Sequence, residues 1–119
     1  MRYKRHVIND ARPGAAMTLE ILQVPGCPGA DLLEARLAGL LPDWPAGGPG
    51  LRVIRRVVTS QADAERLGMT GSPTLLADGA DPFARPGERP SVSCRLYLDE
   101  HGHQASAPSS SQLRDALRL

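Results

Sequence analysis

The chain has 119 residues, of which 41% are hydrophobic and 3% aromatic, and its formal net charge is +1. This length suits one compact domain with an aliphatic core, and the balanced charge argues against a nucleic-acid partner, which would require a basic surface. No apolar run approaches the length of a membrane span, and the N-terminus lacks the apolar stretch of a secretory signal. We therefore expect a cytoplasmic protein that binds neither nucleic acid nor membrane.

The patterned sequence begins after the first sixteen residues. Residues 1–16 show no sustained periodicity, so we expect a flexible N-terminal extension followed by a domain over 17–119. The run 18–24 mixes alternation with β-branched residues and predicts a strand. Pro28 suits the first position of a helix, and leucines at helical spacing extend that helix over 28–41.

A second strand and a short helix follow a loop rich in proline and glycine. Residues 51–58 predict the strand. Thr59 or Ser60 can cap a short helix, with Asp63 three residues after Ser60 as in a capping box, and Gly68 suits the end of this helix. Residues 69–77 form a turn that leads into a third strand.

The last third of the chain predicts one more strand and one more helix. A loop over 80–90 precedes the strand 92–98, and a polar loop over 99–108 follows it. Ser109 and Gln112 form another capping box at the start of the last helix. We expect the third and fourth strands to form an antiparallel pair despite the long loop between them.

The element order is therefore β-α-β-α-β-β-α. Strands joined by a helix are expected to be parallel, with a right-handed crossover. The predicted fold is α/β, with a four-stranded mixed sheet and helices on both faces.

Two motifs within this order resemble the thioredoxin–glutaredoxin superfamily, over roughly residues 18–118. They are residues 24–30, Val-Pro-Gly-Cys-Pro-Gly-Ala, and residues 67–76, Leu-Gly-Met-Thr-Gly-Ser-Pro-Thr-Leu-Leu. The resemblance implies a thioredoxin-like fold in which Cys27 begins the first helix and a cis-proline, Pro73, opens the third strand opposite it. It also implies that backbone groups around Thr70, Ser72, Pro73 and Thr74 hold an extended thiol substrate.

The chain departs from the redox motif of that superfamily. The motif has two cysteines separated by two residues, whereas Ala30 occupies the second position here. Pro25-Gly26 replaces the aromatic residue that usually precedes the motif. These departures exclude a dithiol oxidoreductase that works within the motif, and they leave a monothiol protein or a binding domain that has lost redox chemistry.

The chain is also similar to small actinobacterial-type proteins labelled thioredoxin-like or alkylmercury lyase. Three segments carry this similarity: Ser72-Pro73-Thr74, Asp81-Pro82-Phe83 and Ser93-Cys94-Arg95-Leu96-Tyr97. Organomercurial lyases use two cysteines and an acid. Cys27 and Cys94 can supply the thiols, but no acid in the chain matches.

The position of Cys27 favours a reactive thiol. A helix N-terminus presents unpaired N–H groups and a partial positive charge, which stabilise a thiolate. The thiolate is both the nucleophile and the soft-metal ligand. The alternative is a half-buried cysteine that packs as a small hydrophobe.

Cys94 is a possible second thiol, although the predicted topology argues against a direct bridge. If the fourth strand returns antiparallel to the third, two strand spacings of about 9.5 Å separate it from Cys27. A disulfide needs Cα atoms within about 7 Å. We therefore expect Cys94 to face inward from a strand, unless the loop 80–90 folds back and brings two thiolates together for a soft metal.

Three further features have weaker functional interpretations. Arg95 is expected on a solvated strand face or edge, and His101 and His103 in a solvated turn. Phe83 either pins the loop 80–90 to the core or covers the active cleft.

Three functions remain open. The first is monothiol exchange or adduct formation, in which Cys27 reacts with a small thiol or a protein thiol, as a thiol oxidoreductase would. The second is mercury or organomercurial handling by an alkylmercury lyase-like protein that uses Cys27 and Cys94. The third is a non-catalytic thioredoxin-fold binding module. No cofactor is expected, and a metal only under the second function; the sequence leaves the oligomeric state open.

Overall fold

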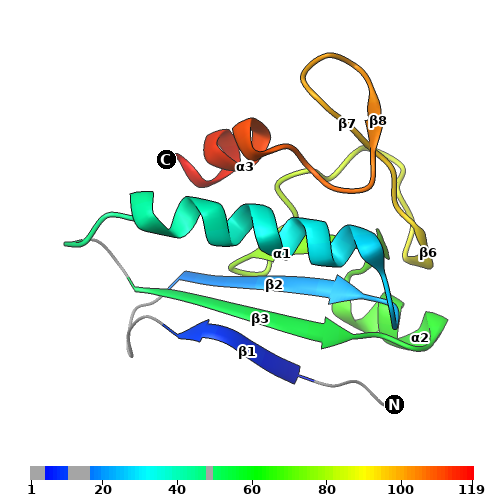
Figure 1. Cartoon of the computed structure of the whole chain (residues 1–119). Helices are drawn as coiled ribbons and strands as arrows, with labels where there is room; N and C mark the ends of the chain where they lie inside the picture. The colour runs from blue at the N-terminus through cyan, green and yellow to red at the C-terminus, as the bar shows by residue number, and fades with distance from the viewer. Residues whose placement is uncertain (1–4, 11–16, 48–49) are drawn as a thin grey trace.

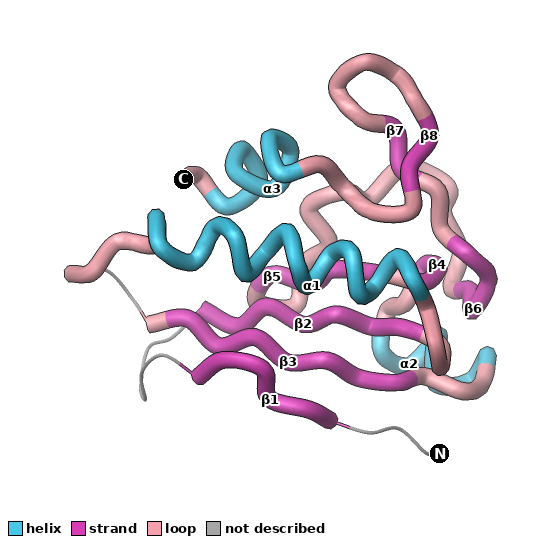
Figure 2. Tube along the Cα trace, in the orientation of Figure 1, coloured by secondary structure: helices cyan, strands magenta, loops and turns pink. Residues whose placement is uncertain are grey.

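The structure is a computed structural model that describes residues 5–10, 17–47 and 50–119. It is a mixed α/β fold built on a four-stranded sheet with the strand order β1-β3-β2-β5 (Figures 1 and 2). The strands are β1 (Arg5–Asp10), β2 (Met17–Gln23), β3 (Leu51–Val57) and β5 (Thr74–Ala77). β2 and β3 are parallel, and the two outer strands are antiparallel to their neighbours, so the sheet is mixed as predicted.

Three α-helices occur in the described part of the chain, and they cover both faces of the sheet. They are α1 (Pro28–Leu40), α2 (Gln61–Leu67) and α3 (Ser110–Leu117), and a 3-10 turn, η1 (Leu41–Asp43), follows α1. α1 lies across one face of the sheet with α3 beside it, and α2 lies near the C-terminal end of β3 (Figure 1). Within the described ranges, no helix combines the length and apolar character that a membrane span requires.

Local sequence signals explain where the helices begin and end. Pro28 occupies the first turn of α1, as predicted. Ser60 caps α2 by accepting a hydrogen bond from the backbone N–H of Asp63. Ser109 and Gln112 form the predicted capping box of α3. The side chains of Ser60, Ser109 and Gln112 accept hydrogen bonds from N–H groups that have no partner inside the helix. The predicted starts of the three helices are confirmed.

The apolar core consists of two clusters separated by the sheet. Successive strand residues point to opposite faces, so Leu75 of β5 packs with the α1 and α3 cluster while Leu76 packs with the α2 cluster. In the same way, Ile21 and Leu22 of β2 belong to different clusters. This alternation confirms the prediction of helices on both faces.

One edge of the sheet comes from the segment predicted as an N-terminal extension. β1 pairs antiparallel with β3, from Arg5 opposite Arg56 to Asp10 opposite Arg52. The rest of that segment, 1–4 and 11–16, lies outside the described residues.

The predicted fourth strand is wrong, because 92–98 does not join the main sheet. Its first half is β6 (Ser91–Cys94), which pairs parallel with β4 (Thr70–Ser72) just before Pro73. Its second half is β7 (Tyr97–Leu98), which forms a hairpin with β8 (Gln104–Ala105) inside the predicted polar loop. Of the four predicted strands, the sheet therefore contains three.

The burial of Arg95 explains why residues 92–98 do not join the main sheet. The prediction that Arg95 is solvated is also wrong. Its side chain is 2% exposed and forms ion pairs with Asp81 at 2.7 Å and Glu88 at 3.3 Å. The guanidinium nitrogen that pairs with Glu88 also donates to the carbonyl of Phe83, and the guanidinium lies 4.7 Å from the ring centroid of Tyr97. A buried guanidinium needs such partners, so the loop 80–90 folds around Arg95 instead of forming a hairpin.

Candidate functional site

Cys27 is located as predicted, at the N-cap of α1. Its carbonyl accepts hydrogen bonds from the backbone N–H groups of Ala30 and Asp31, which begin the helix. The residue is 7% exposed and packs in the cluster formed with α3, and its thiol makes no capping bond to α1, which is described throughout. The thiol is therefore at a helix N-terminus but is almost covered.

Pro73 lies against the first turn of α1, and its peptide bond with Ser72 is cis, as expected. A Cβ added to Gly29 would lie 3.0 Å from the Pro73 ring and 2.5 Å from the carbonyl oxygen of Ser106. Gly29 therefore allows two other segments to approach the helix beside Cys27. Arg36 holds the second of these segments by donating to the carbonyls of Ala107 and Pro108.

The structure brings together the four residues predicted to bind substrate, but most of their polar groups are already bonded within the chain. The Ser72 hydroxyl accepts from the N–H of Val24, and the Ser72 carbonyl accepts from the N–H of Arg95. The Thr74 hydroxyl accepts from the N–H of Thr70 and donates to the carbonyl of Gly71. The Thr70 hydroxyl is the exception, since it is buried with no partner among the described residues.

Cys94 is not the inward-facing residue that we expected. It is exposed, at the end of β6, and its register partner is Ser72. After the loop 80–90 the chain pairs parallel with β4, so it returns to the segment before Pro73, as we expected if this loop folds back. The parallel pairing of β6 thus places Cys94 beside Ser72, the residue before Pro73.

Gly71 makes this close pairing possible. Its φ is +121°, and a Cβ there would lie 2.7 Å from the Cβ of Arg95. Any other residue would therefore meet both backbone strain and a steric clash. This glycine is the sequence signal that another segment packs against β4.

A charged cluster lies between the sheet and the first turns of α1. Arg55 of β3 donates to Asp31 at 2.9 Å, to Glu34 and to the side chain of Gln23. Burial alone would lower the pKa of Arg55, but its hydrogen bonds and charge interactions with the two carboxylates outweigh burial and raise that pKa. The cation therefore offsets two negative charges on the helix that Cys27 begins.

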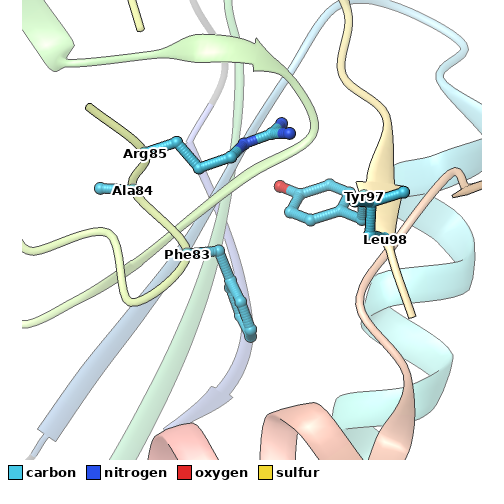
Figure 3. Close-up of a pocket in the computed structure, with 5 residues that line it drawn as sticks. All are labelled: Phe83, Ala84, Arg85, Tyr97 and Leu98. Atoms are coloured by element: carbon cyan, nitrogen blue, oxygen red, sulfur yellow. The ribbon is translucent and has the colours of Figure 1, made fainter. Parts of the chain in front are cut away.

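Tyr97 connects Pro73 to a pocket that the sequence did not predict. Its hydroxyl donates to the carbonyl of Pro73, and burial raises its pKa above the ordinary value of 10.0. Phe83 meets the Tyr97 ring edge-on at 5.9 Å, so it pins the loop 80–90 to the core, one of its two predicted roles. The pocket is lined by Phe83, Ala84, Arg85, Tyr97 and Leu98 (Figure 3).

No group of three or more metal-ligating side chains occurs in the part of the chain that the structure describes. His101 and His103 are exposed in the β7–β8 hairpin, where their backbone N–H groups donate to Asp99. They therefore lie in a solvated turn, as expected.

No protein-family model, curated protein sequence or solved structure matches the chain.

Proposed function

We propose that the protein is a thioredoxin-like monothiol protein in which Cys27 exchanges with, or forms an adduct with, a small thiol or a protein thiol. The observation that carries the proposal is the position of Cys27 at the N-cap of α1, with Pro73 against the first turn of the same helix. The N–H groups of a helix start favour a thiolate over a thiol, and the thiolate is the nucleophile.

The proposed reaction is one thiol–disulfide exchange. The Cys27 thiolate attacks one sulfur of a disulfide, a new disulfide forms to Cys27, and the other half leaves as a thiolate that takes up a proton. Cys27 is oxidised and the leaving thiol is reduced, so the step needs no other reactant. Release of the adduct then requires a second thiol from solution or from a partner.

The test compares three proteins in an exchange assay with glutathione disulfide: the wild type, Cys27→Ser and Cys94→Ser. We expect adduct formation at Cys27 in the wild type and in Cys94→Ser, and its loss in Cys27→Ser. Mass spectrometry of the digested protein identifies the modified cysteine. Equal adduct formation in the wild type and Cys27→Ser would contradict the proposal and favour a non-catalytic binding module.

A second candidate is mercury or organomercurial handling by Cys27 and Cys94. The observation that favours it is the register of β6, which brings Cys94 to Ser72 at the end of the sheet where α1 begins. Two thiolates suit a soft metal. We expect the protein to bind one equivalent of Hg²⁺. The bound Hg²⁺ should protect both cysteines from alkylation. Protection of a single cysteine, or of neither, would contradict this candidate.

A further inference from the structure

We propose that the pocket lined by Phe83, Ala84, Arg85, Tyr97 and Leu98 is a binding site for a small carboxylate that carries one aromatic ring. In this proposal the ring lies between the apolar side chains, and the carboxylate binds the guanidinium of Arg85. The lining contains neither cysteine, so the site is separate from Cys27 and stands independently of the proposed thiol chemistry.

The pocket has the size and the lining that an aromatic ring requires. Its volume is about 190 Å³, and four of its five lining residues are aromatic, leucine or alanine (Figure 3). An apolar cavity of about 150 Å³ accepts benzene. The pocket therefore has room for one six-membered ring with a small substituent.

Contacts within the chain fix the walls of the pocket. The ring of Phe83 packs edge-on against Tyr97, and the Tyr97 hydroxyl donates to the carbonyl of Pro73. The carbonyl of Leu98 accepts a hydrogen bond from the side chain of Gln112 at 2.7 Å. Because these residues are already ordered, binding loses little free energy to their ordering. A ring in the pocket also covers part of the Leu98 side chain, which is 55% exposed, and this burial favours binding.

Arg85 supplies the positive charge that a carboxylate needs. Its side chain is 52% exposed, and it points toward Tyr97 across the pocket (Figure 3). Within the described residues, its guanidinium bonds through Nη2 alone, to the carbonyl of Leu96 at 3.0 Å and to Glu88 at 3.5 Å. Nη1 and Nε are therefore available to a ligand. A guanidinium binds a carboxylate through two parallel N–H groups, which selects a carboxylate over a neutral substituent.

Glu88 competes only weakly for this guanidinium. Its contact with Arg85 Nη2 is through Oε2 at 3.5 Å, close to the limit for a hydrogen bond. Its other oxygen, Oε1, accepts from the backbone N–H of Arg85 at 2.8 Å and from Arg95 at 3.3 Å. Glu88 therefore keeps a cation and a backbone donor when the Arg85 guanidinium turns to a ligand.

The first experiment is an NMR titration of the backbone amides of the full chain with three probes. Benzoate carries both the ring and the charge, benzyl alcohol carries the ring alone, and acetate carries the charge alone. We expect benzoate to bind with a Kd of about 1 mM or tighter, and to shift the amides of residues 83–85 and 97–98. Benzyl alcohol should bind about tenfold more weakly, because it lacks the charge-assisted hydrogen bonds. Acetate should not saturate at about 10 mM.

Three results of this titration would overturn the proposal. They are a benzoate titration that does not saturate at about 10 mM, amide shifts centred on another part of the chain, and equal affinities for benzoate and acetate. A peptide that ends in phenylalanine carries the same ring and carboxylate, so Gly-Gly-Phe is titrated as well. Tighter binding of this peptide than of benzoate would overturn a free small acid as the ligand.

The second experiment tests the charge with Arg85→Met and a matched control, Arg89→Met. Arg89 is an exposed arginine of the same loop and does not line the pocket. We expect Arg85→Met to weaken benzoate binding about tenfold and to leave benzyl alcohol binding unchanged, whereas Arg89→Met changes neither. Equal losses in the two variants would overturn the assignment, since benzoate would then respond only to the charge of the loop.

The third experiment tests the position of the ring with Leu98→Ala and its control, Leu96→Ala. Leu96 is 51% exposed and does not line the pocket. We expect Leu98→Ala to weaken benzoate and benzyl alcohol by the same factor, about three- to tenfold, and Leu96→Ala to affect neither. Unchanged affinities in Leu98→Ala would overturn the proposed site. Unchanged amide shifts in α1 and β2 verify that each variant is folded.

Discussion

Two parts of this chain are held together by different kinds of interaction. In the first part, which consists of β2, β3, β5, α1 and α2, buried aliphatic side chains recur at strand or helix spacing. In residues 80–105, which we call the Arg95 arm, ion pairs and hydrogen bonds to one buried guanidinium bring the loop and its short strands together. Apolar residues at regular spacing can be recognised in a sequence. The partners of a buried charge can be recognised only in the tertiary structure.

The difference predicts that damage to the first part is global and damage to the Arg95 arm is local.

The largest effect is expected from Leu33→Ala in α1. Leu33 is fully buried, so its truncation leaves a cavity and lowers the free energy of unfolding by about 3 to 4 kcal/mol. Its neighbour Leu32 is 36% exposed, and Leu32→Ala should change stability by less than about 1 kcal/mol. Urea denaturation measures both. Similar losses in the two variants would mean that α1 does not use one face for packing.

The next effect is expected from Arg95→Met. The change leaves Asp81 and Glu88 without their buried cation and should cost about 3 kcal/mol. Amide hydrogen exchange should accelerate in the Arg95 arm while α1 and β2 stay protected. Arg85→Met is the control, because Arg85 is half-exposed and its pair with Glu88 should contribute less than about 1 kcal/mol. Loss of protection across the whole sheet would show that the two parts are not separable.

Two glycine variants should change stability in opposite directions. Gly71→Ala places a Cβ 2.7 Å from that of Arg95 at a φ of +121°, and we expect a loss of about 2 kcal/mol. Gly39→Ala, inside α1 with nothing within 4 Å, should gain about 0.5 to 1 kcal/mol. Thermal unfolding measures the change in stability of both variants. A neutral Gly71→Ala would mean that β4 and Arg95 are not in close contact in solution.

The smallest effect is expected from Tyr97→Phe, which removes the hydrogen bond to Pro73 at a cost of about 1 kcal/mol at neutral pH. Because burial raises the pKa of Tyr97 in the folded state, the stability it contributes is complete below the unfolded value of 10.0 and is lost as pH rises toward the folded pKa. Urea denaturation from pH 7 to pH 11 should therefore show a steeper alkaline loss in the wild type than in Tyr97→Phe. Parallel curves would mean that the hydroxyl is not buried.

The candidate site was only partly predictable. Cys27, Pro73 and the segment around Ser72 were placed correctly, because a strand end, a helix start and a proline turn are local signals. The exposure of Cys94 and the burial of Arg95 were predicted wrongly, since both depend on how the loop 80–90 returns. The hydrogen bond from Tyr97 to Pro73 was not predicted, because it joins residues that are 24 positions apart in the chain.

Local patterns in the sequence were enough to predict three helices, three strands of the sheet and the position of one thiol at a helix start. These features depend on residues that are close together in the chain, so the local spacing of residue types is enough to predict them. The pairing of β6 with β4, and with it the position of Cys94 beside Ser72, follows from contacts between distant parts of the chain. That pairing depends on the close approach of Gly71 and Arg95, and on carboxylates from a distant loop that neutralise a buried charge.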